Sequence, residues 1–204
     1  MISHKHKYIF IHIPKTGGSS VEISLLGSEG ITNPIPLHRL PEKHKQEYRV
    51  GGGKHDQHFP LELFEESYQK EYFCFTFVRN PWDMLVSEYL WIKKVRFSKS
   101  FYADVSFTQF VKLLAKGWAP AQVWHQLPST DFINDNMDFI GRFENLQEDF
   151  NTICDKIGIP QQTLPHNNRS DRKHYTEYYD DETKDMIASK YALDIKCFGY
   201  EFGS

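Results

Sequence analysis

The sequence predicts an α/β fold with a mainly parallel sheet, because short apolar runs alternate with segments of helical periodicity. Residues 8–13 and 72–78 are nearly continuous apolar runs rich in β-branched and aromatic side chains, the pattern of strands that are buried on both faces. A helix is expected after each run. The length of 204 residues and the 40% share of hydrophobic residues suit one compact domain, which we predict over residues 1–204.

The helix expected after the second run has clear start signals and an apolar stripe. Asn80 is a good helix cap, and Pro81 suits the first helical position because no N–H is needed there. Ser87 lies off the stripe, beside Asp83, and is expected to face a ligand at the edge of the sheet rather than the core. The stripe recurs at helical spacing through Trp82, Leu85, Val86, Tyr89 and Leu90.

Further elements are expected toward the carboxyl terminus. Ser106 and Gln109 have the spacing of a capping box, and the helix that they begin is expected to stop at Gly117. Residues 27–60 contain several Gly and Pro residues without sustained periodicity, so they are predicted to form loops. A strand, a helix and a last helix are predicted over residues 138–143, 146–157 and 179–191.

The most informative segment is residues 14–20, Pro-Lys-Thr-Gly-Gly-Ser-Ser, which directly follows the first apolar run. Glycines let the backbone approach a phosphate closely, N–H groups at a helix start point toward it, and Lys15 adds a positive charge. The order differs from that of a Walker A loop, in which the lysine follows the second glycine. The segment therefore predicts an anion site at the start of the first helix.

This segment resembles the 5′-phosphosulfate loop of sulfotransferases that use 3′-phosphoadenosine 5′-phosphosulfate (PAPS). A second likeness lies in residues 75–89, where Arg79 at a strand end and Ser87 eight residues later resemble the family's 3′-phosphate segment. Segment 140–146, and the region from segment 164–170 through residues 198–200, are similar to the carbohydrate-sulfotransferase branch, found in the Golgi and in bacteria. The resemblance implies a P-loop-like three-layer α/β sandwich with a central, mainly parallel sheet flanked by helices.

The resemblance also implies how PAPS is bound and used. Lys15 is expected to stabilise the departing phosphate oxygen while a sulfuryl group moves in line to an acceptor hydroxyl. Arg79 is expected to bind the 3′-phosphate through its planar fork, and Ser87 to add a hydrogen bond. The basic segment 167–173, which contains Arg172, is expected to close over the nucleotide. The alternative is that this segment is a solvated basic loop. The remaining contacts are expected from the backbone and hydroxyls of Thr16, Gly17, Gly18, Ser19 and Ser20.

A general base is expected between the two motifs, where the related enzymes place a histidine or a carboxylate. Histidine accepts a proton at neutral pH because its ordinary pKa is about 6.5. His55 and His58 are the candidates, and a surface role for either is the alternative. His55 is preferred because it comes just after the glycine run 51–53, where the base histidine of the family that the chain resembles tends to fall. His12 in the first strand is expected to be structural.

No metal is expected, because the histidines lack a second Cys or His pair with the spacing of structural zinc, and PAPS chemistry needs none. The acceptor is expected to be a hydroxyl on a carbohydrate, since aromatic faces suit sugar rings. The side chains expected near it, with core packing as the alternative, are Trp118, Trp124, His125 and Gln126.

The net charge and the cysteine content argue against some classes of protein. The net charge of −3 and a pI near 6.4 argue against a general nucleic-acid binder, which needs many Lys and Arg contacts to phosphates. Cys74, Cys154 and Cys197 lie in apolar patterns, so buried free thiols are expected rather than disulfides. No apolar span precedes the first run, and a cytoplasmic enzyme is therefore expected.

Two other functions stay open from the residues alone. A small-molecule kinase of the P-loop type would need a lysine after the second glycine and a strand that ends in a magnesium-binding aspartate, and neither is evident. A non-catalytic nucleotide-binding protein would keep Lys15 but would not depend on His55 or His58.

Overall fold

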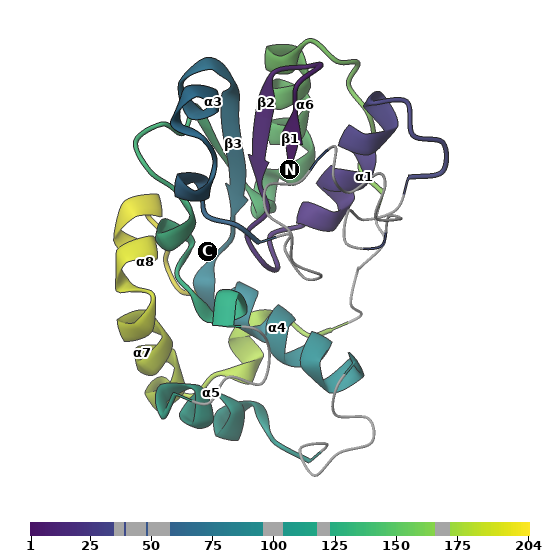
Figure 1. Cartoon of the computed structure of the whole chain (residues 1–204). Helices are drawn as coiled ribbons and strands as arrows, with labels where there is room; N and C mark the ends of the chain where they lie inside the picture. The colour runs from purple at the N-terminus through teal and green to yellow at the C-terminus, as the bar shows by residue number, and fades with distance from the viewer. Residues whose placement is uncertain (35–38, 40–47, 49–57, 96–103, 118–122, 166–171) are drawn as a thin grey trace. The chain divides into compact units, whose positions relative to one another are not determined.

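The computed structural model describes residues 1–34, 39, 48, 58–95, 104–117, 123–165 and 172–204. The chain divides into two compact units, of which unit 1 contains residues 1–78 and 131–169 and unit 2 contains residues 79–130 and 170–204. Figure 1 traces both units along the chain. The single domain over residues 1–204 stays a prediction.

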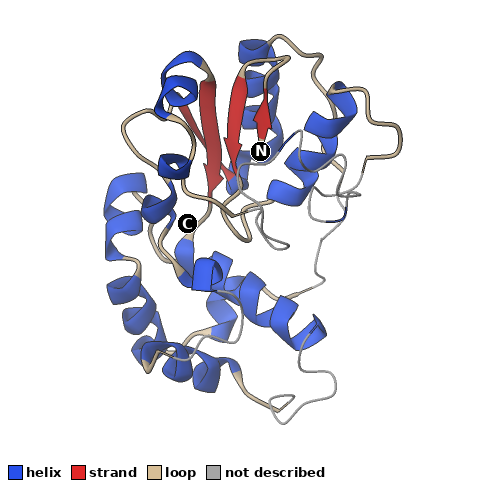
Figure 2. Ribbon diagram, in the orientation of Figure 1, coloured by secondary structure: helices blue, strands red, loops and turns tan. Residues whose placement is uncertain are grey.

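Unit 1 is built on a sheet in which the strands of the described residues lie in the order β1-β2-β3-β4 (Figure 2). Strands β2 (Tyr8–Ile11), β3 (Phe73–Val78) and β4 (Phe139–Arg142) run parallel to one another. The short β1 (Ile2–Ser3) pairs antiparallel with β2. This arrangement confirms the predicted α/β class and the three predicted strands, and it adds β1.

Aromatic side chains on one face of this sheet begin the core of unit 1. Phe10 lies opposite Phe75 in the parallel register, and their rings stack with centroids 5.2 Å apart. Helices α1 (Gly18–Ser28) and α6 (Leu146–Ile157) bury their apolar side chains in the same core. The core includes Tyr8, Phe10, Val21, Leu25, Phe75, Phe77, Phe150 and Ile153.

The opposite face of the sheet is also buried, as the continuous apolar runs predicted. Ile9 and Ile11 alternate with the aromatic residues of β2 and have no more than 1% exposure. The short helix α3 (Glu66–Glu71) precedes β3 and was not predicted, because six residues are too few to show helical periodicity. The 3₁₀ helices of unit 1 include η2 (Leu61–Leu63) and η5 (Phe143–Asn145).

Unit 2 is helical over the residues that are described. Its α-helices are α4 (Pro81–Val95), α5 (Phe107–Ala115), α7 (Asp181–Lys190) and α8 (Ala192–Phe198). Short 3₁₀ helices are η3 (Val123–Gln126), η4 (Ser129–Phe132) at the boundary between the units, and η6 (Tyr175–Tyr178).

Local start signals position these helices as predicted. The backbone N–H of Trp82 donates to Asn80 Oδ1 at 3.1 Å, so Asn80 caps α4. Both hydrogen bonds of the capping box between Ser106 and Gln109 are present at the start of α5. Most of the predicted loop 27–60 lies outside the described residues.

Two predictions about the carboxyl-terminal region were wrong. The helix predicted over residues 179–191 is present as α7, but it is not the last helix, because Tyr191 leaves the helical conformation with φ −109° and ψ 28° and α8 follows it. Cys74 and Cys154 are buried free thiols as predicted, but Cys197 is exposed, because it lies on the outer face of α8. Among the described residues, no helix is both long enough and apolar enough to cross a membrane.

Candidate functional site

The predicted phosphate loop, residues 14–20, connects β2 to α1 in unit 1. Lys15 has a left-handed backbone with φ 65°, which is uncommon for a residue with a Cβ, and Gly17 caps α1 with φ 85°. No side chain caps this start of α1, and no acidic residue lies in its first turn, all of which is described. The N–H groups and the positive end of the helix dipole therefore suit an anion.

Two hydroxyls of this loop have backbone acceptors in unit 1. Thr16 is completely buried and its Oγ1 donates to the carbonyl oxygen of Ile13 at 2.9 Å. Ser20 Oγ donates to the carbonyl oxygen of Pro165 at 2.7 Å. A hydroxyl has one hydrogen to donate, so in this arrangement both side chains support the loop. Ser19 and Ser20 at the helix start are both partly exposed.

A buried polar cluster of His12, Glu22 and His58 lies beside the loop. His12 Nδ1 lies 2.7 Å from Glu22 Oε1, and the exposed fractions of the two side chains are 4% and 0%. His58 Nδ1 lies 2.7 Å from the carbonyl oxygen of His12. A carbonyl oxygen only accepts, so His58 Nδ1 carries the hydrogen. The two histidine rings meet edge to face with centroids 4.6 Å apart.

Gly18 is the point at which this cluster meets the loop. A Cβ at this position would lie 2.1 Å from His12 Cδ2 and 2.3 Å from His12 Nε2, far inside van der Waals contact. The His12 ring therefore fills the space that any larger residue at position 18 would need. The His12 ring thus packs against Gly18 of the loop, and His58 lies next to His12. The other candidate base, His55, falls outside the described residues.

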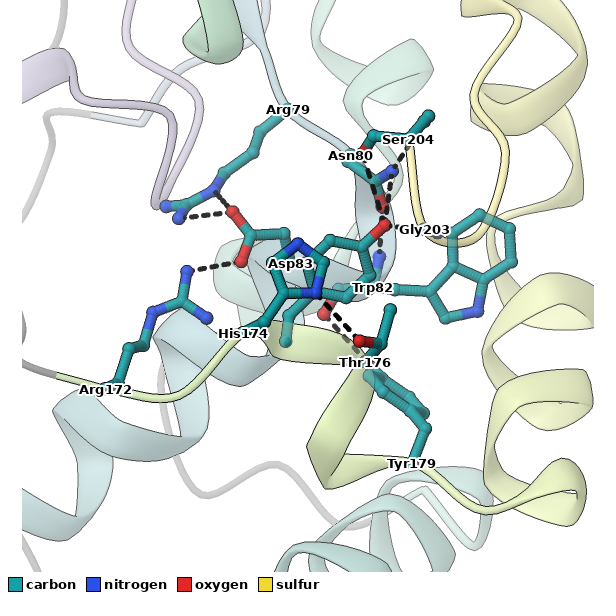
Figure 3. Close-up of polar contacts among 11 residues, drawn as sticks. Arg79, Asn80, Trp82, Asp83, Arg172, His174, Thr176, Tyr179, Gly203 and Ser204 are labelled. Carbon is teal, nitrogen blue, oxygen red and sulfur yellow. Dashed lines mark hydrogen bonds and ion pairs between the residues drawn. The ribbon is translucent and has the colours of Figure 1, made fainter.

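Unit 2 supplies the residues predicted for the 3′-phosphate. Arg79 directly follows β3, is buried, and donates from Nε and Nη2 to Asp83 Oδ2 at 2.8 and 2.7 Å. Arg172 Nη2 donates to the other oxygen, Asp83 Oδ1. Asp83 thus joins the two arginines, as Figure 3 shows. Ser87 lies one helical turn beyond Asp83 and is partly exposed.

The start of α4, which follows Arg79 and carries Asp83, is fixed by other contacts within unit 2. Asn80 Nδ2 donates to the carbonyl oxygen of Glu201 at 3.0 Å. The Tyr179 hydroxyl donates to the carbonyl oxygen of Trp82 at 2.9 Å (Figure 3). Burial raises the pKa of Tyr179 far above its ordinary range, so this hydroxyl stays neutral and keeps its hydrogen.

Residues expected near an acceptor are described only in part. The His125 ring stacks on Trp91 with centroids 5.4 Å apart, and its Nδ1 lies 3.2 Å from Glu88 Oε2. Trp118 and the side chain of Trp124 fall outside the described residues. Among the residues that are described, no cluster of three or more His, Cys, Asp or Glu side chains is arranged to hold a metal ion.

Two residues of these sites did not stand out in the sequence as functional. Asp83 follows Arg79 by four residues, a spacing that lets two opposite charges form an ion pair. This spacing is the signal from which the role of Asp83 could have been predicted. Glu22 gave no such signal, because a glutamate in a helix is normally exposed.

Comparisons with known proteins agree with these observations. The chain matches the model of the sulfotransferase family over residues 1–201. A protein of Archaeoglobus fulgidus named only as uncharacterized is 40% identical over 95 residues, which are 45% of this chain and 72% of that protein. Carbohydrate sulfotransferase 14 of Danio rerio is 24% identical over 98% of this chain, which spans only 61% of that relative. Because the family model covers nearly the whole chain, this protein is an enzyme of the sulfotransferase family.

Proposed function

We propose that this sulfotransferase moves a sulfuryl group from PAPS to a hydroxyl of a carbohydrate. The observation that carries the proposal is the loop before α1, where Lys15 adopts a left-handed backbone beside a helix start that has no side-chain cap. A strained residue at a helix start with open N–H groups is typical of an anion site. The distant likeness to carbohydrate sulfotransferase 14 supports a carbohydrate acceptor.

The charges of PAPS match the groups that each unit offers. The 5′-phosphosulfate suits Lys15 and the backbone N–H groups at the start of α1, which lie in unit 1. The 3′-phosphate suits the guanidinium groups of Arg79 and Arg172, with Ser87 as a further donor, and these lie in unit 2. We propose that one nucleotide engages both sets.

The proposed transfer has a balanced sequence of bond changes. A base removes the proton of the acceptor hydroxyl, the oxygen forms a bond to sulfur, and the bond between sulfur and the oxygen of the 5′-phosphate breaks. Lys15 stabilises the negative charge that develops on that phosphate oxygen, because its ammonium is a compact point charge. The product nucleotide is 3′-phosphoadenosine 5′-phosphate (PAP).

A histidine is the proposed base, and the geometry favours one tautomer of His58. Because His58 Nδ1 donates its hydrogen to the carbonyl oxygen of His12, the neutral ring has its basic lone pair on Nε2. That tautomer is competent to accept a proton. His55 stays the other candidate, and the cytoplasmic location expected from the sequence stays a prediction.

The proposal is tested by transfer of radiolabelled sulfate from PAPS to a panel of oligosaccharides, with Lys15→Ala as the control. Labelled oligosaccharide that is absent with Lys15→Ala supports both donor and acceptor. Label that enters simple alcohols or phenols but no oligosaccharide would keep the donor and overturn the acceptor. A purified, folded protein that neither transfers label nor binds PAP would overturn the whole proposal.

A further inference from the structure

Asp83 is the shared partner of two arginines that come from distant parts of the chain. One carboxylate oxygen accepts two hydrogen bonds from Arg79, and the other accepts one from Arg172, which lies 89 residues away in sequence. Figure 3 shows the two guanidinium groups approaching the same carboxylate from different directions. Asp83 is therefore a hydrogen-bond acceptor that both guanidinium groups share.

The three side chains are largely buried, with exposed fractions of 7% for Arg79, 12% for Asp83 and 16% for Arg172. Two positive charges and one negative charge leave the group with one net positive charge. Removing such charges from water is costly, so a buried ionic group is weak evidence for a stabilising role. A net positive charge held in a fixed geometry suits recognition of an anion instead.

Arg172 also lines open space that a ligand can enter. With Lys173, Glu177 and Tyr178 it lines an open surface hollow of about 590 Å³ in unit 2. Asp83 thus holds one arginine that is almost completely buried and one that borders this hollow.

We infer that Asp83 is a positioning residue that holds Arg79 and Arg172 as a paired guanidinium site for the 3′-phosphate. The inference rests on the proposed function, since it assumes that the 3′-phosphate binds Arg79. It makes Asp83 a determinant of the choice between nucleotides with a 3′-phosphate and nucleotides without one. Asp83 itself does not touch the phosphate, because both are negatively charged.

Asp83→Asn has two opposing effects on the binding of the 3′-phosphate. Removing the carboxylate charge would by itself attract an anion more strongly. However, an asparagine has one accepting oxygen, and its amide nitrogen would face a guanidinium donor, so at least one arginine loses its partner. We infer that the loss of geometry outweighs the gain in charge.

The test is to measure by calorimetry how tightly each protein binds PAP and adenosine 5′-monophosphate, which differ by the 3′-phosphate alone. Wild type is expected to bind PAP more tightly. Asp83→Asn is expected to lower this preference about tenfold to a hundredfold, the value of one charge-assisted hydrogen bond, with little change for the monophosphate. Asp83→Glu keeps the charge but displaces the oxygens, and an intermediate loss is expected.

The matched control is Asp194→Asn, since Asp194 is a buried carboxylate of unit 2 that accepts the backbone N–H of Ser129 at 2.6 Å. It is expected to lower the melting temperature but to keep the preference for PAP. If wild type prefers PAP and the Asp83 variants keep or increase that preference, the inference is overturned while the proposed function stands. If wild type binds PAP and the monophosphate equally, the proposed binding of the 3′-phosphate by Arg79 fails and the inference fails with it, whereas a wild type that binds neither nucleotide overturns the proposed function itself. Should Asp83→Asn fail to fold, the result with Asp83→Glu decides.

Discussion

His58 donates its Nδ1 hydrogen to the backbone carbonyl oxygen of His12 across 2.7 Å. His12 in turn holds Glu22 through its own Nδ1, also at 2.7 Å, and its ring lies against Gly18 of the phosphate loop. A candidate base is thereby linked to the backbone at the end of β2, directly before the loop. The link fixes both the orientation of the His58 ring and its tautomer.

Replacing His58 by Asn should separate its basic nitrogen from its structural hydrogen bond. The Asn amide nitrogen donates from near the position of Nδ1, so the bond to His12 is kept, but no basic nitrogen remains. We predict that kcat falls about 10²- to 10⁴-fold while the melting temperature stays close to that of wild type. The measurement is kcat at saturating PAPS, together with thermal unfolding.

His55→Asn is the matched comparison for this variant. If His55→Asn abolishes turnover while His58→Asn leaves kcat unchanged, the base is His55, and His58 has only a structural role. If both variants turn over normally, neither histidine is the base.

Gly18→Ala should destabilise the protein, because its Cβ would overlap the His12 ring, which the bond to Glu22 prevents from moving away. We predict a loss of about 1–3 kcal/mol in the free energy of unfolding, as for other overpacked sites, measured by denaturant titration. Gly27→Ala in the same helix is the control, since its Cβ would meet no atom closer than 3.8 Å. It should be neutral or stabilise α1 by about 0.5–1 kcal/mol.

A double mutant shows whether the overlap is the cause. In a His12→Ala background, where the ring is absent, Gly18→Ala should lose most of its effect. An undiminished effect in that background would mean that Gly18 is required for another reason.

Lys15 carries a positive charge that is expected to act in catalysis, and its backbone conformation is unfavourable. Two substitutions separate the effect of the charge on kcat from the effect of the backbone on stability. Lys15→Ala and Lys15→Gly both remove the ammonium, so kcat should fall about 10²- to 10³-fold in each. Glycine adopts φ 65° without strain, so Lys15→Gly should be more stable than Lys15→Ala by about 0.5–1 kcal/mol. Thermal unfolding of the two proteins measures this difference, and equal stability would contradict a left-handed Lys15 in solution.

The three cysteines should differ in reactivity. Burial raises the pKa of Cys74 to about 12 and that of Cys154 to about 11, so neither forms a thiolate readily, whereas Cys197 is exposed. A thiol reagent at about pH 8 should modify one cysteine per native chain and all three after denaturation. Mass spectrometry identifies the modified residue, and rapid modification of Cys74 in the native protein would contradict its burial.

The raised thiol pKa values also predict how stability depends on pH. The ordinary pKa of a thiol is about 8.5, so above this pH the unfolded chain loses protons that folded Cys74 and Cys154 still hold. The folded state then binds more protons than the unfolded state, and the free energy of unfolding should decrease as the pH rises from about 9 toward 11. Replacing both cysteines by alanine should remove this part of the decrease.

Features that depend on local sequence were predictable. The cap at Asn80, the capping box at Ser106 and the phosphate loop each depend on residues within a few positions of one another. The bridge from Asp83 to Arg172 was not predictable, because it joins residues 89 positions apart and depends on tertiary packing. The pair of His12 and Glu22 was missed for the same reason, since both residues are buried only in the folded chain.

Strands and helices too short to show a repeating pattern were missed as well. Strand β1 has two residues and α3 has six, which is too short for an apolar pattern to repeat. The last predicted helix ended at residue 191, so the seven-residue α8, which begins at Ala192, was missed for the same reason.

The central claim is that the Lys15 loop and Arg79 bind opposite ends of one nucleotide. A crystal structure of the protein with PAP tests it most directly. We predict that the 5′-phosphate lies against Lys15 and the N–H groups at the start of α1, and that the 3′-phosphate lies within hydrogen-bonding distance of Arg79. Clear density for the nucleotide away from either residue would contradict the claim.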